Sequence, residues 1–73
     1  MKFAPGDHVI VNSYLTDNYA GRHGVVVQVW PKVESPTGKF QFQYAVSMDG
    51  TGRYLVYNED QLEFDVLDQL ARL

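Results

Sequence analysis

The chain has 73 residues, a formal net charge of −3 and no cysteine. A chain of this length builds a single small core, so we predict one domain, and the lack of cysteine excludes disulfides, thiolate metal sites and a thiol nucleophile. Hydrophobic residues make up 45% and aromatic residues 14% of the chain, which is the composition of a globular protein and excludes a disordered one.

A Pro-Gly-Asp turn at residues 5–7 is predicted to lead into a first strand over residues 8–12. Because side chains alternate between the two faces of a strand, Val9 and Val11 share one face, and we assign that face to the interior. Residues 13–22 are rich in turn-forming side chains and too numerous for a tight hairpin. They are therefore expected to form a surface loop.

The second predicted strand covers residues 25–30 and is largely apolar on both faces, which indicates a central position in the sheet. We expect Val27 to lie in the core and Gln28 to lie at the surface. Pro31 has no main-chain N–H group to donate to a neighbouring strand, so the strand is predicted to end there. A second loop is then expected over residues 31–38.

The third predicted strand has the clearest alternation in the chain, with five apolar side chains on one face: Phe40, Phe42, Tyr44, Val46 and Met48. The Asp49-Gly50 pair that follows is typical of a hairpin turn, and it predicts a fourth strand over residues 53–57. Residues 58–61 are expected to form one helical turn, and residues 62–64 a short fifth strand.

Residues 65–73 change to helical spacing and predict a short amphipathic helix with one apolar stripe: Val66, Leu67, Leu70 and Leu73. Because so short a helix is not stable alone in water, the stripe is expected to pack on the rest of the protein or on a partner. This tail is also acidic. Residues 54–73 carry one basic and five acidic side chains, whereas residues 1–53 carry five basic and four acidic ones.

Apolar residues never run for the roughly 18 positions that a membrane-spanning helix requires. The first residues also lack the apolar stretch of a signal peptide. The sequence therefore predicts a cytoplasmic protein without contact to a membrane.

Four segments combine glycines with short apolar runs: Asp7-x-Val9-x-Val11, Gly21-x-x-Gly24-x-Val26, Tyr44-x-Val46 and Gln61-Leu62-Glu63. Together they resemble the SH3-like barrels of the KOW and Tudor type over about residues 5–64. The resemblance implies an all-β fold, a small five-stranded antiparallel barrel over residues 1–64, followed by the short helix at 65–73. Such barrels are often docking modules.

The residues offer no basis for catalysis. His8 and His23 could meet across neighbouring strands, but no cysteine and no metal-binding histidine spacing accompany them. The serines lack the glycine context of a nucleophile elbow. We therefore expect a non-enzymatic protein with no metal site and no cofactor.

Protein binding is the leading hypothesis, because the aromatic side chains exceed what a small core can enclose and such residues are enriched at interface centres. We expect a small bacterial or phage accessory protein, a monomer or weak homodimer, that regulates or inhibits a larger complex. The loops at 13–22, 31–38 and 49–53 are predicted to form one binding rim, with the partner-binding residues Tyr14, Tyr19, Arg22, Trp30 and Arg53. Trp30 could instead cap the end of the barrel.

The alternative hypothesis is a KOW-type RNA-binding module, associated with transcription or translation. It is favoured by scattered Lys and Arg residues interleaved with aromatic rings that could stack on bases. The net charge of −3 opposes it, since binding to phosphates requires an excess of positive charge.

Overall fold

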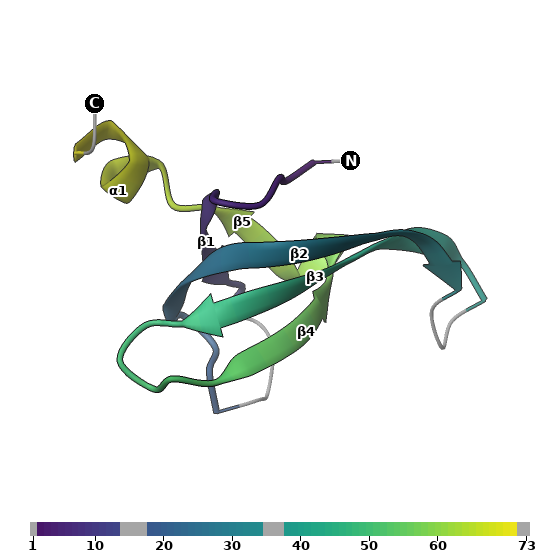
Figure 1. Ribbon diagram of the computed structural model, residues 1–73, viewed down its shortest axis with the longest axis horizontal. Coiled ribbons are helices and arrows are strands. Elements are labelled where there is room, and N and C mark those ends of the chain that lie inside the picture. Colours follow the sequence, from purple (N-terminus) through teal and green to yellow (C-terminus); the bar gives the residue numbers. More distant parts are fainter. Residues whose placement is uncertain (1, 14–17, 35–37, 72–73) are drawn as a thin grey trace.

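The computed structural model describes residues 2–13, 18–34 and 38–71 (Figure 1). Its five strands are β1 (His8–Val11), β2 (His23–Glu34), β3 (Phe40–Met48), β4 (Tyr54–Asn58) and β5 (Leu62–Phe64). They form one antiparallel sheet in the order β4-β3-β2-β1-β5. A 3-10 turn, η1 (Glu59–Gln61), connects β4 to β5, and α1 (Val66–Ala71) follows β5. The predicted all-β class with five antiparallel strands is confirmed.

The sheet is not closed, so the prediction of a complete barrel is wrong. Strands β4 and β5 are the two edges of the sheet, and within the described chain neither pairs with the other. The physical reason is that β5 has only three residues and all of them pair with β1. The sheet curls over its core, and among the described residues neither β4 nor β5 pairs with a further strand (Figure 1).

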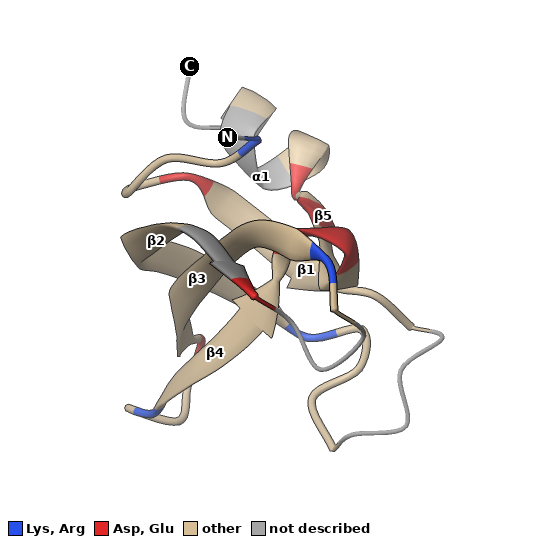
Figure 2. Cartoon of the chain, turned by 90° about the vertical axis from the view of Figure 1, so that its right-hand side faces the viewer, with Lys and Arg blue, Asp and Glu red and all other residues tan. Residues whose placement is uncertain are grey.

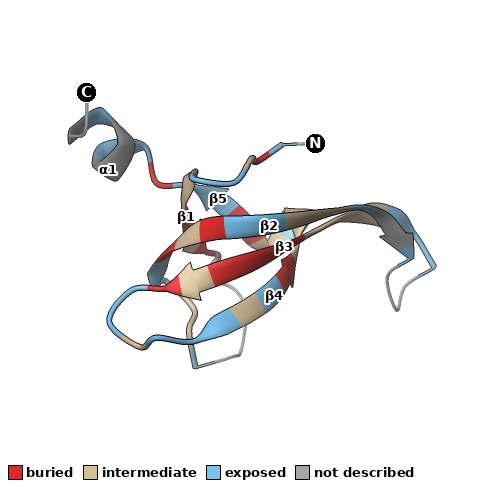
Figure 3. Ribbon diagram, viewed as in Figure 1, coloured by how far each residue is buried: buried red, intermediate tan, exposed pale blue. Residues whose placement is uncertain are grey.

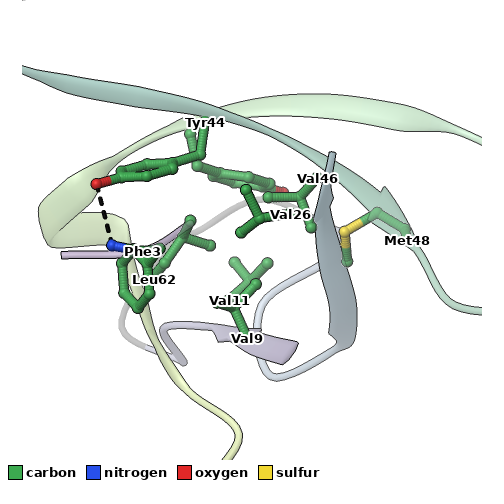
Figure 4. Packing of buried hydrophobic residues seen from close by; sticks show 9 residues of the cluster. Phe3, Val9, Val11, Val26, Tyr44, Val46, Met48 and Leu62 are labelled. Carbon is green, nitrogen blue, oxygen red and sulfur yellow. Dashed lines mark hydrogen bonds between the residues drawn. The ribbon is translucent and has the colours of Figure 1, made fainter. Parts of the chain in front are cut away.

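The core side chains pack together inside the curve of the sheet (Figure 4), and Figure 3 marks the buried residues in β2, β3 and β4. All five strands and the N-terminal segment contribute to its buried cluster of Phe3, Val9, Val11, Val26, Tyr44, Val46, Met48, Tyr57 and Leu62. The ring of Phe3 packs edge-on against the ring of Tyr44, with 5.1 Å between the ring centroids. The interior positions predicted for Val9 and Val11 are confirmed, since neither side chain is exposed to solvent.

The prediction for Val27 is wrong, because its side chain is 44% exposed and Val26 is the buried neighbour. Val26 lies opposite Val46, but the register then shifts at a β-bulge, and Gln28 lies opposite Ala45. A bulge adds one residue to one strand, so Val27 and Gln28 are both directed away from the core.

Strand β2 also continues through Pro31 to Glu34, beyond the predicted end of the strand. A second register shift between Trp30 and Val33 accommodates the proline without a ladder hydrogen bond from its nitrogen. The hairpin of β2 and β3 therefore extends past the core (Figure 1). Phe40 lies at its far end and is 70% exposed, although the same face of β3 is buried at Tyr44 and Met48.

The predicted C-terminal helix is limited to the six residues of α1, and its apolar stripe is not packed on the sheet. Val66, Leu67 and Leu70 are 58%, 83% and 59% exposed, so the expected burial within this chain is wrong for them, and Leu73 lies outside the described residues. The reason lies at Asp65, which is buried and accepts a 2.5 Å hydrogen bond from Nδ1 of His23. This anchor ends the sheet and directs α1 away from the core (Figure 1).

Candidate functional site

Two of the predicted binding residues lie together near the start of β2. The guanidinium carbon of Arg22 is 5.8 Å from the centroid of the Tyr19 ring, a cation–π distance. Arg22 is exposed, whereas Tyr19 is partly buried and packs against the core. Tyr14, the third aromatic or basic residue predicted in this loop, lies outside the described residues.

The other two predicted residues, Trp30 and Arg53, lie on different elements, and the single rim stays a prediction because residues 14–17 and 35–37 of its loops lie outside the described residues. Trp30 is half-buried on β2, eight residues beyond Arg22, which is roughly 26 Å along an extended strand. Arg53 is exposed in the β3–β4 turn, and that turn lies beside the start of β2, where the N–H of Asp49 donates to the carbonyl of His23. The far ends of β2 and β3, at Glu34 and Phe40, lie at the opposite end of the described chain (Figure 1).

On the convex side of β2, β3 and β4, the described side chains between Val25 and Trp30 of β2 and their partners on β3 and β4 form a surface without a charged group. Three cross-strand rows define it: Val25, Ser47 and Tyr54 in the first, Gln28, Ala45 and Val56 in the second, and Trp30, Gln43 and Asn58 in the third. Val27 at the bulge joins the second row. We call these ten residues the outer face, and Figure 2 shows β3 and β4 free of acidic and basic residues.

The outer face exposes large apolar side chains. Tyr54 is 69% exposed, Val56 55% and Val27 44%, while Ala45 between them is buried. The polar members Gln43 and Asn58 bond to each other, with 2.8 Å between Nε2 and Oδ1. Sequence reasoning missed this surface because it assigned Val27 to the core. The available signal was the complete absence of Lys, Arg, Asp and Glu from residues 40–48 and 54–58.

A shallow pocket of about 430 Å³ lies on the other side of β3, where the N-terminal segment and η1 approach the projecting hairpin. Its lining combines two phenylalanine rings with two carboxylates and one ammonium: Lys2, Phe40, Gln41, Phe42, Glu59 and Asp60. These groups can hold a small polar or aromatic molecule by contact.

The hydroxyl of Tyr44 connects the walls of this pocket. It accepts hydrogen bonds from the main-chain N–H groups of Lys2 (3.1 Å) and Phe3 (3.3 Å), and it donates to Oε2 of Glu59 at 2.8 Å. Figure 4 shows the hydroxyl directed toward the N-terminal segment. Burial raises the pKa of the Tyr44 hydroxyl above its ordinary value of 10.0, so the group keeps the proton that it donates to Glu59.

This raised pKa predicts an alkaline loss of stability. Below pH 10 both folded and unfolded protein hold the Tyr44 proton, but above it the unfolded state releases the proton first, so unfolding is favoured as pH rises toward the folded pKa. We expect the urea midpoint to fall between about pH 9.5 and pH 11 more steeply than in Tyr44→Phe, which has no proton to release. Equal slopes in the two proteins would contradict this role.

The histidines do not form a metal site with the described acids. His23 bonds to Asp65, and within residues 2–13, 18–34 and 38–71 no group of three or more His, Cys, Asp or Glu side chains could hold a metal ion. Over the same residues, neither the length nor the apolar content of any helix is sufficient to cross a membrane. Comparison of the chain with protein-family models, curated proteins and solved structures finds no match.

Proposed function

We propose that this chain is a non-enzymatic docking module, whose outer face binds the uncharged, apolar surface of a partner protein. The observation that supports the proposal is the outer face itself, which exposes Tyr54, Val56 and Val27 and carries no charge. The solvent side of an antiparallel sheet ordinarily carries polar and charged residues. Depletion of charge together with exposed aromatic and aliphatic groups is the composition of an interface centre.

Trp30 strengthens this assignment. It is half-buried at one end of the outer face and lies opposite Gln43. Tryptophan and tyrosine are the residues whose truncation most often weakens protein complexes. Trp30 near one end and Tyr54 near the other would provide two aromatic anchors separated by the aliphatic groups of Val27 and Val56.

The curled five-stranded sheet with a 3-10 turn before its last strand is compatible with an SH3-like architecture of the KOW or Tudor type. We propose that relationship as the structural context of the docking function, with a small accessory regulator or inhibitor of a larger complex as the biological role. RNA binding is less favoured, because the outer face offers no cation to neutralise a phosphate.

A matched pair of substitutions tests the docking surface. The immobilised protein is exposed to lysate of its native host, with and without nuclease, and captured proteins are identified and purified. We expect Val27→Lys to weaken binding of the purified partner at least tenfold, because it buries an unpaired ammonium in an apolar interface. Leu67→Lys makes the same change on α1 and is expected to leave affinity unchanged.

Other outcomes would contradict the proposal. Loss of binding in Leu67→Lys but not in Val27→Lys would indicate that the interface lies on α1. Loss in Tyr19→Ala and Arg22→Ala alone would place it at the start of β2. Capture that disappears after nuclease treatment would support the RNA-binding hypothesis. Thermal melting of each variant verifies that the fold is intact.

A further inference from the structure

We propose that β4 pairs with β4 of a second copy of this chain, in an antiparallel arrangement about a two-fold axis at Val56. The pairing would join two sheets into one, and it would place two copies of the outer face side by side. This dimer goes beyond the docking function proposed above, because it uses the edge of the sheet and needs no other partner.

The two edges of the sheet differ in how they are protected. Strand β5 has three residues and carries Glu63, and a short edge with a charged side chain discourages pairing with another chain. Strand β4 has five residues, Tyr-Leu-Val-Tyr-Asn, with no charge, no proline and no register shift in its pairing with β3. Such an edge is a ready template for another strand.

The hydrogen-bond pattern shows which main-chain groups face this open edge. The carbonyl of Arg53 accepts from the N–H of Met48, so Arg53 directs its main-chain groups toward β3. Alternate residues of an antiparallel strand then direct theirs the other way, which assigns Tyr54, Val56 and Asn58 to the open edge. In agreement, the N–H of Asn58 donates to Oε1 of Gln61 at 2.8 Å and not to β3.

The strand that pairs with β4 is β4 of a second copy, because the sequence of this strand is complementary to itself in an antiparallel pairing. With Val56 opposite Val56 of the second copy, Tyr54 lies opposite Asn58 and Leu55 opposite Tyr57, so every residue meets one from the same face of its sheet. In this register the N–H and carbonyl of Val56 face those of its copy, and the N–H of Tyr54 faces the carbonyl of Asn58, while the N–H of Asn58 stays with Gln61. A shift by a single position would oppose outer-face and core-face residues, which antiparallel pairing does not permit.

The charge distribution is consistent with this arrangement. Because β4 carries no charge, the two copies meet without like-charge repulsion along the paired strands, even though each chain has a net charge of −3. The contact is limited to one five-residue strand from each chain, so the interface is small and the dimer is of the weak, concentration-dependent kind.

Single-cysteine variants test the register, since the chain has no cysteine of its own. Residues in a hydrogen-bonded antiparallel pair have Cα atoms about 5.5 Å apart, within the range of a disulfide. We expect Val56→Cys to form a disulfide-linked dimer under mild oxidation at least tenfold faster than Tyr54→Cys. The latter side chain is the more exposed, but in this register the two copies of residue 54 are too far apart to react.

Leu67→Cys, at the most exposed apolar site of α1, reports the rate of random collision. Light scattering and sedimentation from about 10 μM to about 1 mM are expected to show a reversible dimer in the parent protein and a monomer in Val56→Lys, where two ammonium groups would face each other. Equal cross-linking of all three cysteine variants, faster cross-linking of Tyr54→Cys, or a parent that stays monomeric would overturn the proposal.

The dimer proposal and the docking proposal can be rejected independently of each other. The cross-linking and scattering measurements use purified protein only, whereas the docking test depends on Val27, which lies on β2 and away from the β4 edge. A monomeric parent that still loses its partner in Val27→Lys would retain the docking proposal and reject the dimer.

Discussion

Val26→Asp is expected to unfold the protein, whereas Val27→Asp is expected to leave it folded. The side chain of Val26 is 1% exposed and lies opposite Val46 in the core, so an aspartate there would bury an unpaired carboxylate. Such a burial costs several kcal/mol, which is comparable with the total stability of roughly 5 kcal/mol expected for a domain of this size.

Val27 is the matched control because it is the adjacent residue, has the same side chain and is 44% exposed at the bulge. We expect its aspartate variant to lose no more than about 1 kcal/mol of unfolding free energy. Urea denaturation followed by circular dichroism measures both proteins. Comparable losses in the two variants would show that the bulge does not set the orientation of these side chains.

Gly24→Ala is expected to cost at least about 2 kcal/mol of unfolding free energy through overpacking. A Cβ atom at this position would lie 2.5 Å from Cγ1 of Val46 and 2.8 Å from the main-chain carbonyl oxygen of Ser47. The side chain of Val46 can adjust only at the expense of the core, and the carbonyl of Ser47 is held in the sheet. Gly24 is therefore required for the close approach of β2 and β3.

A second glycine separates this steric effect from a conformational one. Gly21 has a φ of +79°, and a Cβ atom there would meet nothing within 4 Å, so Gly21→Ala is expected to cost only about 1–2 kcal/mol of backbone strain.

Adding Val46→Ala to Gly24→Ala removes one of the two clashes and should recover part of the loss, relative to Val46→Ala alone. Independent, additive effects of the two substitutions would rule out the proposed contact.

The outer face and the β4 edge give the proposed docking function a simple physical basis. The core face of the curled sheet is occupied by the chain's own apolar side chains, which leaves the convex side free to present Tyr54 and Val56. Pairing of two β4 strands would extend that surface without covering it. A dimer would then present two equivalent docking faces to one partner, and simultaneous engagement raises apparent affinity.

Much of the fold was predictable from the sequence, because it follows from local chemistry. The alternation in β3 and the turn at Asp49-Gly50 predict a hairpin from short-range rules alone. The inner positions of Val9 and Val11 follow from a two-residue period bounded by a turn. These features follow from neighbouring residues, and the pairing of the strands left them unchanged.

The site and the closure of the sheet were decided by tertiary structure. The bulge after Val26 arises from pairing with β3. The local sequence Val-Val-Val-Gln at residues 25–28 does not reveal it. The same is true of Asp65, whose contact with His23 spans 42 positions and turns α1 away from the core. Sequence by itself determined which strands form; contacts between distant residues determined which faces remain exposed, because exposure depends on what the rest of the chain covers.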